Sequence, residues 1–398
     1  MAQGPGDDVD LDIHAADAYE RGPCIWSRLR ERDGLVHSPR HGGFYVAARH
    51  EDALKVLMTP AVFGSGKGIT LPPPGGIRSF HIPAEIDPPL HGEYRALMQP
   101  LLDGPHARAL EPAIGEIARG LIARIPDDEP FDFVRVFARP LPIVVALDIM
   151  RIDRSHAGEL EQMVEDLHHE VATGTPTGAA ERLRIFAEDV IAQRRWTLSD
   201  ADDDVVASIL RGQVEGRALS AAEQMSMVRQ ILVGGFDTTS IALATMMKWL
   251  AENPDEAARL RADPVAIDAV SEEIVRFASP STYLRREVMV PTELAGTPLQ
   301  VGDSVLVAFA AANRDPAKFA CPESIDARRK PNMHVGFGAG RHRCVGSFVA
   351  KAQMRVAFTE LLDRFEGFAL EAEPPITYSS GLGQGIMSMT MRFHRRAG

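Results

Sequence analysis

The segment HVGFGAGRHRCVGS, residues 334–347, constrains the fold of this chain more than any other feature. It places Cys344 after the glycines Gly338 and Gly340, and a run with apolar residues at helical spacing follows directly. Glycines at those positions allow a bulky group to approach the backbone closely. We expect the thiol to lie at a helix N-terminus, where amide donors and the helix dipole lower the pKa of a thiol and favour a thiolate that binds soft metals.

Bulk properties exclude several classes of protein. With 398 residues, 45% of them hydrophobic and 25% charged, the chain is large enough for a deep core and is neither disordered nor fibrous. The N-terminus is polar and acidic, and no stretch approaches the ~20 apolar residues of a membrane span. A net charge of −12 disfavours nucleic acid as a partner. The three cysteines lack CxxC spacing, which argues against disulfides and zinc. We expect a cytoplasmic protein with no membrane or nucleic-acid partner.

No linker, repeat or change in composition divides the chain. We therefore expect one domain over residues 1–398, with residues 1–20 as a flexible tail. Ser220 and Glu223 have the spacing of a capping box, which predicts a helix that begins there and runs to about Ala251. A helix of roughly thirty residues far exceeds the mean of ~11–12, so it should cross the molecule.

Other segments predict the rest of the fold. A second helix is expected from Asp263-Pro264 to the break at Ser279-Pro280, and short strands are expected at 42–48 and within 284–308. Glycine and proline concentrate in 64–90, which predicts a long functional loop. The sequence thus predicts a mainly α fold with a minor β-sheet region.

Three roles for Cys344 remain open from the residues alone: an inert buried thiol, a catalytic nucleophile, or an axial ligand to haem iron. The spacing around it resembles the haem-binding signature FGxGxHxCxG of the cytochrome P450 family. Every defined position is present: Phe337, Gly338, Gly340, His342, Cys344 and Gly346. The resemblance implies haem b (iron protoporphyrin IX) with Cys344 as the axial iron ligand. It also implies the cytochrome P450 fold, a helix-rich triangular prism with a long central oxygen-binding helix.

A second resemblance lies in the helix expected after residue 264. Glu273 and Arg276 match the ExxR pair of the family. Taken alone, two residues at i and i+3 on a helix would form an exposed ion pair that contributes little to stability. The resemblance instead implies a structural pair that is buried beneath the haem and tied to the loop before the cysteine.

The propionates of a haem need cationic or hydrogen-bonding partners where they are buried. The segment DPPLHGEYR, residues 87–95, resembles the DPPxHxxxR stretch of the family and supplies His91 and Arg95. Arg286 aligns with an arginine on a strand of the family, and His342 precedes the cysteine by two residues. The resemblance implies that these four side chains bind the propionates.

Adjacent glycines interrupt the long helix. Gly234 and Gly235 each cost about 1 kcal/mol relative to alanine in a helix interior, so something must approach the backbone there. The segment GGFDT resembles the (A/G)GxDT motif of the family. This implies room for dioxygen at the glycines, a hydrogen bond from Thr238 to the bound oxygen, and proton relay by Asp237.

The resemblance implies a haem-thiolate monooxygenase of the soluble, bacterial, camphor-hydroxylase-like class. Such an enzyme uses dioxygen as co-substrate, with two electrons and two protons, to hydroxylate, epoxidise or demethylate a small to medium hydrophobic compound. The alternatives are a peroxide-driven peroxygenase and a non-catalytic haem sensor. Asp237 and Thr238 argue against the first alternative, and the lack of an output module argues against the second.

Electrons must come from outside, because no GxGxxG fingerprint follows a strand. The family implies a small ferredoxin, typically [2Fe–2S], and a ferredoxin reductase that draws on NAD(P)H, with this chain as a monomer. Seven basic residues and no acid lie between Asp326 and Glu360, which predicts a positive docking face. The alternative is that these cations only neutralise the thiolate and the propionates.

By resemblance, the substrate pocket draws on loop 64–86, the middle of the long helix and two later loops. The candidates are Ile82, Ile86, Gln230, Val233, Leu284, Ile386 and Met387. They suit a compact apolar molecule such as a terpenoid or an aromatic compound, and Gln230 adds a polar contact. Each of them is equally compatible with an ordinary core position.

Overall fold

The computed structural model describes residues 8–15, 18–71, 81–173, 175–379 and 383–396. The α-helices are α1 (Ala18–Glu31), α2 (His50–Met58), α3 (Leu90–Ala96), α4 (Gly104–Ile122), α5 (Pro140–Ile149), α6 (Ala157–Thr173), α7 (Ala179–Thr197), α8 (Val205–Arg211), α9 (Ala221–Glu252), α10 (Pro254–Ala262), α11 (Ile267–Ala278), α12 (Phe309–Ala312) and α13 (Ser347–Arg364). The strands are β1 (Val36–Ser38), β2 (Phe44–Ala47), β3 (Phe63–Gly64), β4 (Phe131–Asp132), β5 (Gln213–Val214), β6 (Arg217–Ala218), β7 (Leu284–Val288), β8 (Thr292–Leu294), β9 (Thr297–Leu299), β10 (Ser304–Val307), β11 (Phe365–Leu370), β12 (Thr377–Tyr378), β13 (Ile386–Ser388) and β14 (Thr390–Arg395).

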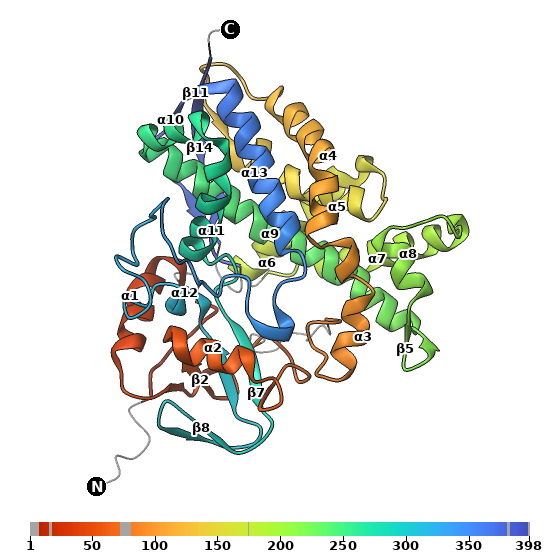
Figure 1. Cartoon of the computed structure of the whole chain (residues 1–398), viewed down its shortest axis with the longest axis vertical. Coiled ribbons are helices and arrows are strands. Elements are labelled where there is room, and N and C mark those ends of the chain that lie inside the picture. Colours follow the sequence, from red (N-terminus) through yellow and green to blue (C-terminus); the bar gives the residue numbers. More distant parts are fainter. Residues whose placement is uncertain (1–7, 16–17, 72–80, 174, 380–382, 397–398) are drawn as a thin grey trace.

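The helices and the main sheet occupy different parts of the molecule. Figure 1 shows α4, α5, α9, α11 and α13 together in the upper part, and the sheet below them with α1, α2 and α12. The sheet has the order β1-β2-β10-β7-β3, in which only the β2–β10 pair is parallel. The predicted mainly α fold with a minor β region is confirmed.

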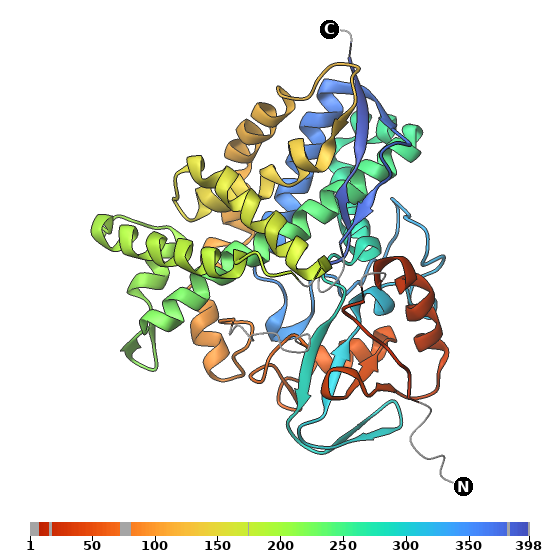
Figure 2. The same ribbon diagram turned by 180° about the vertical axis from the view of Figure 1, so that it is seen from behind.

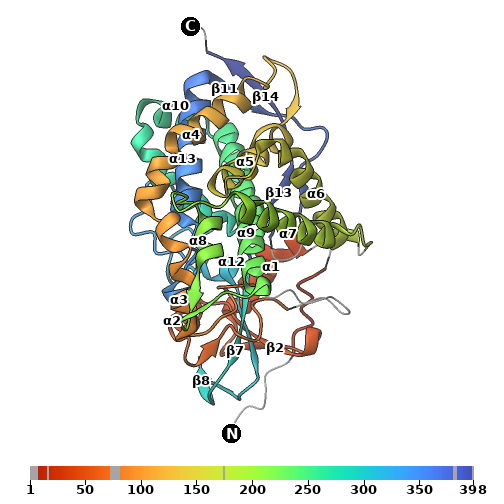
Figure 3. The same ribbon diagram turned by 90° about the vertical axis from the view of Figure 1, so that its right-hand side faces the viewer.

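Helix α9 runs through the middle of the molecule, flanked by other helices (Figures 2 and 3). The side chain of Ser220 accepts from the backbone amide of Glu223, and the carboxylate of Glu223 accepts from the amide of Ser220. This reciprocal cap satisfies amides that a helix start leaves without partners. The predicted long helix is confirmed, with its end at Glu252.

The other predicted elements also form. Helix α11 ends directly before Ser279, whose positive φ of 42° stops the helix. The strand expected at 42–48 is β2, and the region 284–308 contains β7, the β8–β9 hairpin and the buried β10. Among the described residues, no helix combines the length and the apolar character needed to cross a membrane.

Parts of the expected tail and of the loop 64–90 are packed or hydrogen-bonded to other segments. Residues 1–7 and 16–17 of the expected tail lie outside the described residues, but Leu11 and Ile13 are buried against the sheet. In the loop 64–90, residues 72–80 lie outside the described part. The carboxylate of Asp87 accepts hydrogen bonds from the Ser65 and Gly66 amides at 2.6 and 2.9 Å, which ties the two ends of this loop together.

Candidate cofactor site

Cys344 lies between a turn at Gly340–His342 and the start of α13. Its amide donates to the Phe337 carbonyl at 2.8 Å, and Gly338 and Gly340 have φ values of 68° and 65° that favour glycine. A Cβ on Gly340 would lie 2.8 Å from the Leu57 carbonyl oxygen. At this glycine, the close approach that we predicted is therefore to the end of α2.

The residue Cys344 as a whole is exposed, whereas its sulfur is surrounded by many protein atoms. Burial raises its pKa, and hydrogen bonds from the Gly346 and Ser347 amides act in the opposite direction. The position at a helix N-terminus is as expected, but the predicted lowering of the thiol pKa is wrong because burial has the larger influence.

Four basic side chains gather near this cysteine from three parts of the chain. His91 of α3 is 2% exposed and Arg286 of β7 is 3% exposed. The rings of His91 and His342 lie 4.1 Å apart between centroids, and Arg95 lies close enough to Cys344 for their charges to interact. Among the described residues, none of the four forms an ion pair with a carboxylate.

Burial acts on the pKa of every member of this basic cluster (His91, Arg95, Arg286 and His342). Burial and nearby cations lower the pKa of His91 to about 4 and that of His342 to about 3. Burial also lowers the pKa of Arg95, and that of Arg286 to about 10. The Nε2 atom of His342 is buried and has no hydrogen-bond partner within the described part of the chain. A largely buried cluster of two arginines and two histidines with an unsatisfied nitrogen fits a ligand that carries carboxylates, as a haem does.

Glu273 and Arg276 are both fully buried. The guanidinium donates to both carboxylate oxygens at 2.8 Å, a bidentate geometry, and also donates to the carbonyls of Asn313, Pro322 and Ser324.

The same carboxylate of Glu273 accepts from the Asp326 amide at 2.9 Å, from Arg329 at 3.0 Å and from Asn332 at 3.1 Å. It therefore holds the segment that precedes the cysteine loop. The sequence marked Arg329 only as one of the seven basic residues and did not mark Asn332 at all, since nothing local identifies them as partners of a residue so far away.

The middle of α9 carries the predicted Gly-Gly-x-Asp-Thr stretch. Val233 is 42% exposed and Gly234 is exposed, although half of the residues of this helix are buried. No atom lies within 4 Å of a Cβ placed on Gly235. The Thr238 hydroxyl donates to the Gly234 carbonyl at 3.3 Å, and Asp237 beside it is partly buried. The space beside Gly235 is therefore open to a ligand, whereas a Cβ on Gly234 would lie 3.3 Å from Nε2 of Gln230.

The candidate pocket residues have different surroundings. Ile82 and Ile386 are packed in the hydrophobic core, and the Ile82 amide donates to the Ser226 hydroxyl at 2.9 Å. Ile86, Gln230, Leu284 and Met387 are partly buried, and Val233 is exposed.

Three of the seven predicted surface cations have acidic partners from other segments. Arg329 pairs with Glu273, Lys351 pairs with Glu272, and Arg355 pairs with both Glu111 and Asp268. Within the described ranges, no ion pair involves the other four: Arg328, Lys330, Arg341 and Arg343. The positive surface is therefore smaller than the sequence suggested.

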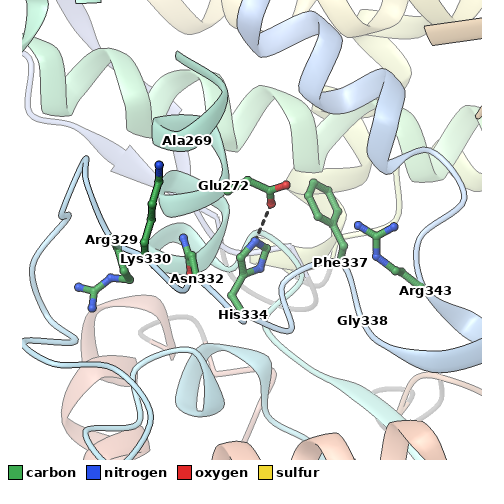
Figure 4. Close-up of a pocket in the computed structure, with 9 residues that line it drawn as sticks. All are labelled: Ala269, Glu272, Arg329, Lys330, Asn332, His334, Phe337, Gly338 and Arg343. Carbon is green, nitrogen blue, oxygen red and sulfur yellow. Dashed lines mark hydrogen bonds and ion pairs between the residues drawn. The ribbon is translucent and has the colours of Figure 1, made fainter. Parts of the chain in front are cut away.

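A hollow of about 320 Å³ borders the cysteine loop. Figure 4 shows its lining residues: Ala269, Glu272, Arg329, Lys330, Asn332, His334, Phe337, Gly338 and Arg343. A second hollow of about 590 Å³ shares Ala269 and Glu272 with the first and includes Phe348. Phe348 is 41% exposed, with Lys351 Nζ 5.2 Å and Arg343 Cζ 5.9 Å from its ring centre. We call the two hollows together the proximal groove.

Comparison with known proteins agrees with this geometry. The family model described as Cytochrome P450 matches residues 177–391. A probable cytochrome P450 127A1 from Sinorhizobium fredii is 32% identical over 372 residues, which cover 92% of this chain and 87% of the relative. The linalool 8-monooxygenase of Pseudomonas putida is 28% identical over 370 residues, which cover 87% of this chain and 89% of that enzyme.

The fold is shared as well. The crystal structure of CYP108D1 from Novosphingobium aromaticivorans superposes with a TM-score of 0.84 at 25% identity and covers 97% of both chains. The family implies a haem iron cofactor and dioxygen as co-substrate. The cysteine loop and the basic cluster fit the haem. Together, the matched family model, the relatives and the shared fold show that this chain is a monooxygenase and belongs to the cytochrome P450 family.

Proposed function

We propose that this enzyme hydroxylates, epoxidises or demethylates a small to medium hydrophobic organic substrate. The observation that supports the haem site most strongly is the basic cluster. Two of its four side chains are buried and two are partly buried, none forms an ion pair with a carboxylate in the described residues, and His342 Nε2 has no partner. Burying such groups is costly unless a ligand satisfies them. Two propionates meet that requirement.

Each part of the site has a proposed task. Cys344 binds the iron through its sulfur, Arg95 and Arg286 supply charge to the propionates, and His91 and His342 supply hydrogen bonds. When bound, the haem supplies oxygen activation and substrate oxidation, and a thiolate ligand favours cleavage of the O–O bond. The protein supplies ligation, placement of the substrate and delivery of protons.

Proton delivery is assigned to Asp237 and Thr238. The Thr238 hydroxyl donates its proton to the Gly234 carbonyl, so the lone pairs of Oγ1 remain able to accept a hydrogen bond from a group beside the glycines. Asp237 is partly buried at the adjacent position of the helix, where it can exchange protons with solvent and pass them on.

Electrons are proposed to come from NAD(P)H through a ferredoxin reductase and a small acidic [2Fe–2S] ferredoxin. The proximal groove supports this, because it combines exposed Phe348 with Arg343 and Lys330 next to the cysteine loop. An apolar anchor inside a charged rim is typical of protein interfaces.

The substrate class rests on the apolar candidates along α9 and the nearby loops. Val233 is exposed, Ile86 and Leu284 are partly buried, and Gln230 offers one polar contact. The relative from Pseudomonas putida is named for linalool, which is consistent with a terpenoid-sized hydrophobic compound.

A screen of hydrophobic compounds by optical spin-state shift tests the substrate class without any redox partner. Compounds that bind are then incubated with NADH, ferredoxin and reductase, and in parallel with hydrogen peroxide. The proposal expects product from the first mixture and little from the second. Efficient turnover with peroxide alone would favour the peroxygenase alternative, and binding without turnover in either mixture would favour the sensor.

A further inference from the structure

Adjacent carboxylates of α11 hold the chain that leads to Cys344 at different points. Glu273, fully buried, binds Asp326, Arg329 and Asn332. Glu272 directly precedes Glu273 on the helix, and its Oε2 lies 2.8 Å from Nε2 of His334. Glu273 belongs to the ExxR pair, whereas Glu272 and His334 have so far been described only as residues that line the proximal groove, with Glu272 as the partner of Lys351.

The hydrogen bonds of His334 define the tautomer of its ring. The Gly336 amide lies 3.0 Å from Nδ1 of His334, and a backbone amide can only donate. Nδ1 must therefore be the acceptor, so the proton of the neutral ring is on Nε2, which donates to Glu272. His334 is thus a bridge that accepts from the cysteine loop and donates to α11.

The loop is closely seated where this bridge meets it. A Cβ on Gly336 would lie 2.8 Å from Val275 Cγ1 and 3.0 Å from the Val275 carbonyl oxygen, so the loop backbone rests directly on the last turn of α11. The next residue, Phe337, accepts the amide hydrogen bond of Cys344 at 2.8 Å. The Glu272–His334 pair is therefore separated from the backbone of the ligand by two hydrogen bonds and one peptide link.

The environment keeps Glu272 ionised. Burial would raise its pKa, but hydrogen bonds from His334 and Lys351 lower it to about 2. Lys351 Nζ lies 2.9 Å from Oε1, so each carboxylate oxygen has its own donor. Figure 4 shows Glu272, His334 and Phe337 lining the same hollow.

We propose that Glu272 and His334 are positioning residues that fix the backbone around Cys344 through the Gly336 amide and so keep the thiolate on the iron. The inference rests on the proposed role of Cys344 as haem ligand. Neither residue touches the haem or the substrate in this scheme. Their effect reaches the site only through the loop.

The test uses the purified holoenzyme and follows thiolate ligation. The red-shifted Soret band of the ferrous carbon monoxide complex reports the thiolate, and its decay in moderate urea gives a rate of ligand loss. His334→Leu removes both hydrogen bonds, and Glu272→Ala removes the carboxylate that orients the ring. We expect each variant to lose the band about tenfold faster, the factor expected for one hydrogen bond, while far-UV circular dichroism changes at the wild-type rate.

Two further variants make the result specific. Glu111→Ala removes a carboxylate from the same groove that pairs with Arg355 and does not contact the loop, so it should behave like wild type. In His334→Asn, the side-chain oxygen can replace Nδ1 as acceptor for the Gly336 amide, and this variant should decay at close to the wild-type rate.

Specific outcomes overturn the inference. Wild-type decay in His334→Leu, equal decay of the Leu and Asn variants, or equal acceleration by Glu272→Ala and Glu111→Ala would each show that the Gly336 bond does not hold the ligand. If His334→Leu fails to fold, the test rests on the decay rates of the red-shifted band in Glu272→Ala and Glu111→Ala. Absence of the red-shifted band in every protein, wild type included, would instead refute Cys344 as haem ligand.

Discussion

The imidazole rings of His91 and His342 lie 4.1 Å apart, although one belongs to α3 and the other to the turn before Cys344. Burial is the main reason that both pKa values are low, at about 4 and about 3, with further lowering from Arg95 for His91 and from Arg286 for His342. Both rings are therefore neutral at pH 7. The positive charge of the basic cluster comes from Arg95 and Arg286.

His91 should make the haem-free protein sensitive to acid. Its pKa in the folded chain is about 4, below the ordinary value of 6.5, so the unfolded chain takes up the proton first as the pH falls. Neutral, buried His91 therefore contributes to the free energy of unfolding. This contribution is complete above pH 6.5 and is lost progressively towards pH 4, by an amount on the order of 3 kcal/mol. Urea unfolding at pH 7 and pH 4.5 measures it. His91→Asn should flatten the dependence.

Thr238→Ala should uncouple electron use from product formation. The variant loses the hydroxyl that can accept a hydrogen bond beside Gly234, so we expect coupled product to fall by at least about tenfold while peroxide rises. Thr245→Ala is the matched control, because its hydroxyl also bonds a carbonyl of α9, that of Ile241 at 2.8 Å. NADH consumed, peroxide and product are measured together. Product at the wild-type level in Thr238→Ala would contradict the assignment.

Cys344→His should abolish monooxygenation. Imidazole does not donate electron density as a thiolate does, so the red-shifted Soret band of the ferrous carbon monoxide complex should disappear. Cys321→Ser changes an exposed cysteine and should leave the band unchanged. A persistent band in Cys344→His would mean that another residue ligates the iron.

Charge reversal at Arg341 or Arg343 should slow reduction by ferredoxin. Neither residue forms an ion pair within the described chain, and Arg343 lines the proximal groove. We expect about tenfold slower reduction at low salt and a smaller difference at high salt, because salt screens exposed charges.

Arg184→Glu on α7, where Arg184 pairs with Glu181, is the control for this prediction. Reduction is followed by stopped-flow spectroscopy. Rates that depend on neither salt nor these substitutions would favour the alternative, in which the cations only neutralise the thiolate and the propionates.

Glu273→Gln should destabilise the protein strongly. It leaves Arg276 and Arg329 without their carboxylate in a buried site, a change that typically costs about 3–5 kcal/mol. Chemical denaturation of the holoenzyme measures the loss. Glu181→Gln removes an exposed partner of Arg184 and should change little. Equal stability of the two variants would show that the buried network contributes little.

Local signals in the sequence were sufficient for the elements that form the site. The capping box at Ser220 and Glu223 defines the start of α9, and the glycine and cysteine spacing defines the loop before α13, since both depend on residues a few positions apart. The buried pair Glu273–Arg276 is visible as a pattern for the same reason. These features carry the family resemblance.

Contacts between distant segments could not be predicted from single positions. The acids that pair with Lys351 and Arg355 belong to α11 and α4, so the size of the positive surface depends on packing. Ile82 and Ile386 were pocket candidates, and only the packed core shows how little of them is accessible. The pKa of the Cys344 thiol also depends on burial, which a sequence does not contain.

The long capped helix, the cysteine in a glycine-rich turn and the family motifs can each be recognised without the fold, because each lies within one short stretch of the chain. Packing in three dimensions brings His91, Arg286 and His342 into one cluster and connects Glu272 to the cysteine loop through His334. These outcomes depend on how helices and loops pack in three dimensions, since burial and hydrogen-bond partners are supplied by segments far apart in the chain.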